Sequence, residues 1–233
     1  MKSIFITGAN RGLGYSLANE GLIRGFNIYA GVKSSDSFPM LDPLKNQYPN
    51  RVHLIEIDVS DEESVKSAFR EVQKTTESLN GIINNAAIML EREKTIEELE
   101  FELVRRSFEI NTFGPMRVVK HFLPLIYAAN DPVIINISSE AGTIVNAFST
   151  NYPYSMSKTA LNMFSERLKH YVQDKGISVY AIHPGWVKTD MGGEEAPGEP
   201  SVSAAGIFNI IEKKLAITSK IAFINHLGKP MPL

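Results

Sequence analysis

Short apolar runs alternate with longer amphipathic stretches along the whole chain. The apolar runs are rich in β-branched residues, and several lack polar residues at alternate positions, as is typical of strands buried on both faces. They occupy residues 3–7, 27–32, 52–57, 81–84, 133–138, 178–183 and 221–224. Strands that alternate with helices indicate a parallel sheet with helices packed against it. We therefore predict an α/β fold with a doubly wound parallel sheet of about seven strands, flanked by helices on both faces.

Capping residues predict the ends of several helices. Ser60 and Glu63 have the spacing of a capping box, which predicts a helix that begins near Asp61. Gly25 and Gly176 stand where glycine commonly ends a helix.

The rest of the pattern indicates a single domain. An amphipathic segment over 97–110 leads into one long helix over 115–129, which Pro115 either opens or kinks. Residues 191–201 are rich in Gly, Pro and Glu and predict a surface loop or lid. Because the chain has no internal repeat and no low-complexity tract, we predict that residues 1–233 form one domain.

Composition excludes several classes of function. The chain is 43% hydrophobic and 21% charged, and its net charge of −2 gives no electrostatic support for a nucleic-acid partner. It contains no cysteine, which excludes disulfides, thiol catalysis and cysteine-ligated metals, and fits a cytoplasmic location. No apolar run approaches the length of a membrane span, so we expect no membrane partner. His183 has no acid or second histidine at metal-binding spacing, so we expect a structural histidine and no metal.

A glycine-rich turn follows the first apolar run. TGANRGLG begins at Thr7, and Gly8, Gly12 and Gly14 precede a predicted helix. Glycine lets the backbone approach a ligand closely, and a helix N-terminus attracts a pyrophosphate. The spacing differs from the usual dinucleotide fingerprint, so this motif alone also fits a tight turn without a ligand.

A second candidate motif is NYPYSMSK, which contains Tyr152, Tyr154 and Lys158. Residues four apart share a helix face, so Tyr154 and Lys158 can lie together, whereas Tyr152 gains no charged neighbour. A cation within about 4–6 Å lowers the pKa of a phenol, which makes Tyr154 a candidate proton donor or acceptor. By itself the pair also fits a solvated helix face.

Several further motifs occur in an order that resembles the short-chain dehydrogenase/reductase family, in its compact single-domain branch. They are the turn TGxxxGxG at 7–14, Asp58-Val59, NNAA at 84–87, Asn111 in INTFGP, Ser138-Ser139, Tyr154 with Lys158, and HPGWVKTD at 183–190. The last motif, extended to MGG, also resembles the C-factor/sniffer-like carbonyl reductase subgroup. The resemblance implies a Rossmann-type fold and an oxidoreductase that transfers hydride between a nicotinamide and a small carbonyl or alcohol.

The resemblance also implies catalytic roles. Tyr154 is the proton donor or acceptor, and Lys158 lowers its pKa and reaches the nicotinamide ribose. Ser139 hydrogen-bonds the substrate oxygen, while Ser138 supports the loop. Asn111 holds a water that links Lys158 to solvent. Tyr152 and Trp186 are candidate walls of the substrate pocket, although Trp186 also fits an exposed, packed loop residue.

Contacts to a dinucleotide cofactor are implied for a larger set of residues at strand ends. Asp58 meets the adenine amino group, although its position equally fits a helix N-terminus. Pro184-Gly185 turns beneath the nicotinamide, and Val187 and Thr189 contact its carboxamide. The full set is Gly8, Asn10, Arg11, Gly12, Leu13, Gly14, Lys33, Asp58, Val59, Asn84, Asn85, Ala86, Tyr154, Lys158, Pro184, Gly185, Val187 and Thr189. Ala87 replaces a glycine of the family pattern, and we expect a local adjustment there.

The cofactor preference depends on charges near the second apolar run. Val32 occupies the position where NAD-dependent members carry an acid, and Lys33 follows it. Arg11 adds a second cation that would attract a 2′-phosphate. Asp36 argues in the other direction. We therefore expect NADP(H) to be preferred, with NAD(H) possible.

Three functional hypotheses follow from these motifs. The first is an NADP(H)-dependent carbonyl reductase. Sugar-nucleotide epimerases share Tyr-x3-Lys but have GxxGxxG spacing and a longer substrate domain. A non-catalytic redox sensor or signalling protein commonly lacks the Tyr–Lys pair, which this chain retains. By resemblance, helices over 113–129 and 155–174 are candidate faces for a homo-dimer or homo-tetramer.

Overall fold

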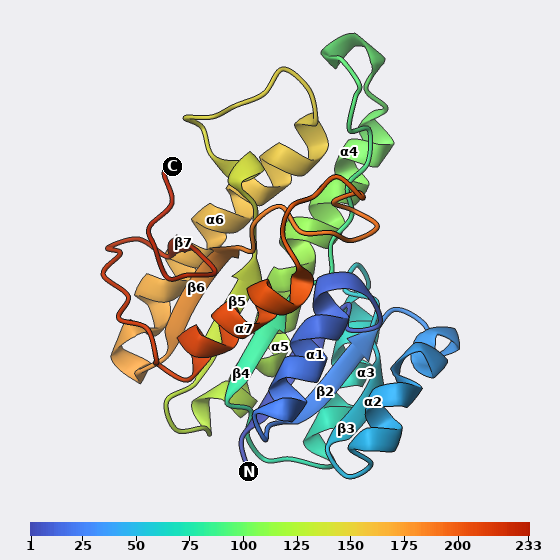
Figure 1. The fold of residues 1–233 in the computed structure, drawn as a ribbon, viewed down its shortest axis with the longest axis vertical. Coiled ribbons are helices and arrows are strands. Elements are labelled where there is room, and N and C mark those ends of the chain that lie inside the picture. Colours follow the sequence, from blue (N-terminus) through green and yellow to red (C-terminus); the bar gives the residue numbers. More distant parts are fainter.

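The computed structural model describes residues 1–233 and contains one seven-stranded sheet with the order β3-β2-β1-β4-β5-β6-β7 (Figure 1). All neighbouring strands are parallel. The strands are β1 (Ser3–Thr7), β2 (Asn27–Val32), β3 (Val52–Glu56), β4 (Gly81–Asn84), β5 (Val133–Ile137), β6 (Ser178–His183) and β7 (Phe223–Asn225). The strand order reverses between β1 and β4, which is where ligands bind in open α/β sheets. The predicted doubly wound parallel sheet is confirmed.

Helices cover both faces of this sheet. They are α1 (Gly12–Ile23), α2 (Asp42–Gln47), α3 (Glu62–Gln73), α4 (Phe101–Phe108), α5 (Gly114–Tyr127), α6 (Tyr152–Val172) and α7 (Pro200–Ile211). Residues of α1, α2 and α7 form one buried cluster with the sheet, and residues of α3, α5 and α6 form another on the opposite face. Helices α1 and α7 are far apart in sequence but lie side by side on the same face of the sheet (Figure 1).

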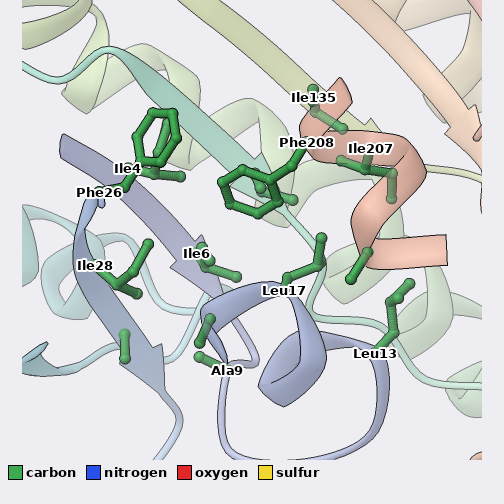
Figure 2. Close-up of a cluster of buried hydrophobic side chains, with 14 of the residues drawn as sticks. Ile4, Ile6, Ala9, Leu13, Leu17, Phe26, Ile28, Ile135, Ile207 and Phe208 are labelled. Carbon is green, nitrogen blue, oxygen red and sulfur yellow. The ribbon is translucent and has the colours of Figure 1, made fainter. Parts of the chain in front are cut away.

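Alternation along each strand divides the side chains between the two cores, which explains why the strands are apolar throughout. Ile4 and Ile6 belong to the α1/α7 core, and Phe5 between them belongs to the opposite one. Figure 2 shows Phe208 of α7 beside Ile4 and Ile6. The rings of Phe208 and Phe26 meet edge to face, with centroids 5.4 Å apart.

Strand boundaries differ slightly from the prediction. β3 ends at Glu56 and β5 at Ile137, each one residue early, and β7 covers Phe223–Asn225 rather than 221–224. The residues that follow β3 and β5 still donate one ladder bond each, Ile57 N–H to Val32 O at 2.7 Å and Ser138 N–H to Ile182 O at 2.8 Å. The main-chain pairing therefore extends one residue past each of these two strands.

The capping box predicted for α3 is wrong. Asp61 is the N-cap residue, and its carboxylate accepts the N–H groups of Glu63 and Ser64. Ser60 instead donates its hydroxyl to Asp58 at 2.6 Å, so it is unavailable to the helix. The predicted C-terminal glycines are confirmed, because Gly25 and Gly176 have φ of 87° and 69°.

The long helix predicted over 115–129 is present as α5, and a break separates it from the amphipathic segment before it. Helix α4 ends at Phe108, a five-residue π-helical turn covers Glu109–Phe113, and α5 begins at Gly114. Pro115 lies in the first turn of α5, so it opens that helix. A π-helical turn of this kind often marks a functional site, and this one contains Asn111. No helix in the structure has the length and apolarity that a membrane crossing requires.

Candidate active site

The glycine turn between β1 and α1 forms a cradle at the end of the sheet. Gly8 and Gly12 have positive φ of 65° and 53°, which side chains adopt with strain. A Cβ at Gly8 would lie 3.0 Å from the Cα of Ala86. Arg11 is the N-cap residue of α1, and its side chain makes no capping bond. It therefore pairs with none of the N–H groups in the first turn of the helix. This geometry fits the pyrophosphate of a dinucleotide.

The segment after β4 is tied to this cradle across the switch point. The Thr7 hydroxyl accepts the N–H groups of Asn85 and Ala86, both at 3.0 Å. The Asn85 amide in turn donates to the carbonyls of Thr7 and Gly8 at 2.9 and 3.1 Å. Asn85 and Ala86 therefore lie beside the glycine turn, as the motifs predict, and Thr7 organises this contact although no motif singled it out.

Asn84 behaves differently from its neighbour. Its amide donates to Asn136 of β5 at 2.8 Å, and Asn136 donates to Ser165 of α6 at 2.8 Å. The Asn84 side chain is thus buried within the sheet beside α6, and it contacts neither Thr7 nor Gly8. Its side-chain oxygen has no hydrogen-bond partner, and its contact with the cofactor stays a prediction.

Ala87 requires no unusual backbone. Among non-glycine residues, positive φ occurs at Glu91, Asp131, Asn151 and Lys213, and not at Ala87. Alanine therefore occupies the usual glycine position without conformational strain.

The two cations predicted to attract a 2′-phosphate each pair with an acid. Lys33 lies 2.9 Å from Asp58, and Arg11 contacts Asp190 in the loop after β6. Burial raises the pKa of Asp58, but hydrogen bonds from Ser60 and the pairing with Lys33 outweigh it, so the pKa is lowered. Asp58 is therefore a persistent anion beside Lys33.

Val59 and Leu13, two of the predicted cofactor contacts, pack in the hydrophobic cores of the protein. Val59 is buried against the start of α5, where a Cβ at Gly114 would lie 2.9 Å from its Cγ2. Leu13 belongs to the α1/α7 core. The Asn10 amide points toward Met40 at 3.6 Å, on the exposed side of the turn.

Ser139 and Tyr154 meet at the carboxyl end of β5. Ser139 caps the short turn Glu140–Gly142, and its hydroxyl accepts the Ala141 N–H at 3.1 Å. Its hydroxyl also lies close to the phenol of Tyr154, in the first turn of α6, near enough to act on the pKa of that phenol. Tyr154 is only 7% exposed. The sequence-predicted serine and tyrosine are thus brought together.

Lys158 lies one turn further along α6, but it does not reach the phenolic oxygen. Its Nζ donates to the carbonyl of Ile137 at 2.7 Å and lies 5.5 Å from the centroid of the Tyr154 ring. Burial lowers the pKa of Lys158 to about 7. Burial also raises the pKa of Tyr154, although the nearby Ser139 hydroxyl opposes this. Desolvation dominates the pKa of both groups in this arrangement, and the effect of Lys158 on the Tyr154 pKa stays a prediction.

Asn111 is fully buried in the π-helical turn, and its hydrogen bonds are made within the protein. Its Oδ1 accepts the Ile88 N–H at 2.9 Å, and its Nδ2 donates to the Ile88 carbonyl at 2.9 Å and the Ser157 hydroxyl at 3.0 Å. Ser157 donates to the carbonyl of Tyr154 at 2.7 Å. Asn111 therefore joins the segment after β4 to the helix that carries Tyr154, and both donors of its amide bind protein groups.

The loop after β6 closes over the glycine cradle. Gly185 has φ of 91°, and the Ser203 hydroxyl donates to the Pro184 carbonyl at 2.6 Å. A Cβ at Gly12 would lie 3.2 Å from the Cγ2 of Thr189. Val187 forms an isolated bridge with Gly198, which fastens the loop 191–199. The excursion 88–100, the loop 143–151 and this loop stand at the same upper end of the molecule (Figure 1).

Replacing Lys158 with methionine is expected to stabilise the protein more at pH 7 than at pH 10. The pKa of Lys158 is lowered from 10.5 to about 7, so between these values the unfolded chain binds a proton that the folded protein releases. The free energy of unfolding therefore falls as the pH falls through this window, and Lys158→Met removes that loss. Urea unfolding of both proteins at the two pH values tests this. If the substitution changed the free energy of unfolding equally at pH 7 and pH 10, Lys158 would have to remain charged when buried.

Comparisons with known proteins agree with this architecture. The sequence model of the family described as short chain dehydrogenase matches residues 2–200. The solved carbonyl reductase Sniffer of D. melanogaster is 30% identical, with a TM-score of 0.91 and 100% of both chains covered. The NADPH-bound carbonyl reductase from chicken fatty liver is also 30% identical, with a TM-score of 0.90 over 100% of this chain and 99% of that one. An uncharacterized oxidoreductase of Schizosaccharomyces pombe is 32% identical over 81% of this chain and 75% of its own length.

The chain belongs to the short-chain dehydrogenase family. It is therefore an oxidoreductase with the Rossmann-type fold that the motifs predict.

Proposed function

We propose that residues 1–233 form one catalytic domain that reduces small carbonyl compounds with NADPH. The observation that carries this proposal is the meeting of Ser139 and Tyr154, with Lys158 behind them, at the end of β5. The glycine cradle opens at the same edge of the sheet. The Sniffer and chicken liver structures, both named carbonyl reductases, support this choice of reaction.

The residues of the site suit a proton transfer. When bound, the nicotinamide would supply a hydride to the carbonyl carbon of the substrate. The Ser139 hydroxyl would donate a hydrogen bond to the substrate oxygen and hold it near the Tyr154 hydroxyl, which would donate the proton. The raised pKa of Tyr154 keeps the phenol protonated at neutral pH, as a donor for reduction requires. Lys158, whose pKa is about 7, can exchange a proton near neutrality.

A preference for NADP(H) over NAD(H) is supported by Lys33 and Arg11, with Val32 at the position of the usual acid. The chicken liver reductase was solved with NADPH bound, which supports the same preference. Lys33 and Arg11 already hold an acid each, so a 2′-phosphate would share or displace Asp58 and Asp190.

Replacing Lys33 with alanine should weaken NADPH binding by about 10-fold while changing NADH binding by less than about 2-fold. The ammonium group attracts a 2′-phosphate that NADH lacks. Fluorescence titration with both cofactors measures the two dissociation constants. Lys45→Ala, an exposed lysine of α2, is the matched control and should change neither. Equal weakening of both cofactors by Lys33→Ala would contradict the assignment.

The rim of the site favours apolar parts of a substrate. Ile144, Val145 and Phe148 are 74%, 70% and 62% exposed in the loop that leads from Ser139 to α6. Trp186 is 52% exposed in the loop after β6, and its indole N–H donates to Gly192 O at 2.7 Å. These side chains support aldehydes and ketones with alkyl or aromatic groups, rather than highly charged substrates.

The experiment that tests the proposal is NADPH oxidation by the purified protein against a panel of aldehydes, ketones and quinones, with NADH alongside. Turnover with NADPH well above NADH is the expected result. Binding of NADPH without turnover of any compound would instead favour a sensing role on the same fold.

A homo-dimer is supported by an apolar groove between α5 and α6. Its walls include Phe113, Met116 and Leu123 on one side and Phe164 and Tyr171 on the other. A second copy related by a two-fold axis would cover the same groove on both subunits. Sedimentation equilibrium should give twice the monomer mass, and Leu123→Glu should give the monomer. A wild-type monomer at micromolar concentrations would contradict the dimer.

A further inference from the structure

The ring of His183 continues the pairing of β5 and β6 beyond the point where their backbones separate. The last main-chain bond there runs from Ser138 N–H to Ile182 O at 2.8 Å. The next bond is made by a side chain, because the Glu140 N–H donates to the Nδ1 of His183 at 3.1 Å. His183 is the last residue of β6, and its side chain is 16% exposed.

This contact requires one form of the imidazole. Since Nδ1 accepts a hydrogen bond, the neutral ring carries its proton on Nε2. Nε2 lies 3.9 Å from a carboxylate oxygen of Glu140, which favours that tautomer. In an imidazolium both nitrogens carry a proton, so Nδ1–H would face the Glu140 N–H and the bond could not form.

The Glu140 amide belongs to the turn that orients Ser139. Ser139 precedes the turn Glu140–Gly142, and its carbonyl accepts the Gly142 N–H at 3.0 Å. Its hydroxyl accepts the Ala141 N–H and contacts the phenol of Tyr154. Loss of the bond at Glu140 would release the backbone one residue from Ser139, where a small displacement has a large effect on a reaction.

We propose that His183 is a positioning residue, whose neutral ring accepts the Glu140 amide and so holds the Ser139 hydroxyl against Tyr154. This role rests on the proposed function, in which Ser139 binds the substrate oxygen. The sequence by itself predicts only a structural role for His183, because no acid or second histidine stands at metal-binding spacing.

Two titratable groups face the ring. Glu140 lies on the turn after β5, and His226 lies after β7, where its main-chain N–H donates to the His183 carbonyl at 3.0 Å. Burial lowers the pKa of His183, the Glu140 carboxylate raises it and His226 lowers it, with a net decrease. The ring thus stays neutral to a pH below the ordinary histidine pKa of about 6.5. Protonation of the ring at lower pH would release the turn Glu140–Gly142, so activity should decline as the pH falls below the pKa of His183.

The test compares His183→Asn with His183→Leu. The Oδ1 of asparagine can replace Nδ1 as acceptor but does not titrate, whereas leucine has no acceptor. With the carbonyl compound turned over fastest in the panel, His183→Leu should lower kcat by about 10-fold or more, with the NADPH Kd changed by less than about 2-fold. His183→Asn should retain about half of kcat or more, and the decline in kcat between pH about 7 and 5 should become shallower. Equal losses in kcat for the two variants, or an unchanged acid decline in His183→Asn, would overturn the proposal.

Two further measurements keep the result interpretable. If His183→Leu does not fold, the pH profile of His183→Asn alone decides. If the wild-type protein turns over no compound, the proposed function has failed, and NMR then tests His183 separately. The ring should be protonated at Nε2, and the amide shifts of Ser139 and Glu140 should titrate with it in the wild type but not in His183→Asn. A neutral ring protonated at Nδ1, or amide shifts independent of it, would overturn the proposal.

Discussion

Replacing Tyr154 with phenylalanine is expected to abolish turnover while leaving NADPH binding nearly unchanged. The substitution removes only the hydroxyl that contacts Ser139, at a side chain that is otherwise buried. General acid catalysis by a positioned side chain contributes about 10²–10⁴-fold, so kcat should fall by that factor or more. Steady-state kinetics and a fluorescence titration with NADPH measure the two quantities.

Tyr152→Phe is the matched control for this prediction. It makes the same chemical change two residues earlier, at the first residue of α6, where no hydrogen bond to Ser139 is made. It should keep kcat within about 2-fold, because it removes no group of the proposed proton transfer. Activity that persists in Tyr154→Phe, or that disappears in Tyr152→Phe, would mean that another group donates the proton.

Replacing Gly14 with alanine should have the largest effect on cofactor binding. The backbone at Gly14 is helical, so the requirement for glycine comes from space. A Cβ there would collide with the carbonyl oxygen of Gly8 and lie 2.6 Å from the Asn85 amide nitrogen. Neither can easily move, because the Asn85 amide is bound to the carbonyls of Thr7 and Gly8. Helix α1 would have to move away from the segment after β4.

We expect Gly14→Ala to raise the NADPH Kd by at least about 10-fold and to lower the free energy of unfolding by about 1–3 kcal/mol. NADPH titration and urea unfolding provide the two values. Ser16→Ala, two residues further along α1 and only partly buried, should change both far less. Wild-type affinity in Gly14→Ala would show that the turn can relax and does not form a rigid cradle.

The fold was largely predictable from sequence because every strand faces two cores. Both faces of β1 are buried, so its central residues Ile4, Phe5 and Ile6 are apolar without alternation. Helix ends were less predictable because capping depends on competing partners. Ser60 has the right spacing to cap α3, but Asp58 holds its hydroxyl, and no local pattern reveals that contact.

The candidate site was predictable as a set of positions, but its internal bonds were not. Ser139 and Tyr154 meet as the motifs predict. The bond from Lys158 to Ile137, however, depends on how α6 lies over β5, and periodicity carries no such information. The polar network that joins Asn84, Asn136 and Ser165 left one sign in the sequence. Asn84 and Asn136 occur in otherwise apolar strands, and a buried amide requires hydrogen-bond partners.

That network has a consequence for how the molecule can vary. Asn136 binds Ser165, and the Ser138 hydroxyl donates to Asn162 at 2.6 Å, so α6 is joined to β5 by directional bonds as well as apolar contacts. Apolar contacts permit a helix to slide or rotate slightly, whereas these bonds fix its register. The loop 143–151 connects two elements that are already locked together. Its length and composition can therefore be exchanged, by evolution or in a chimera, to accept a new substrate without resetting the distance between Ser139 and Tyr154.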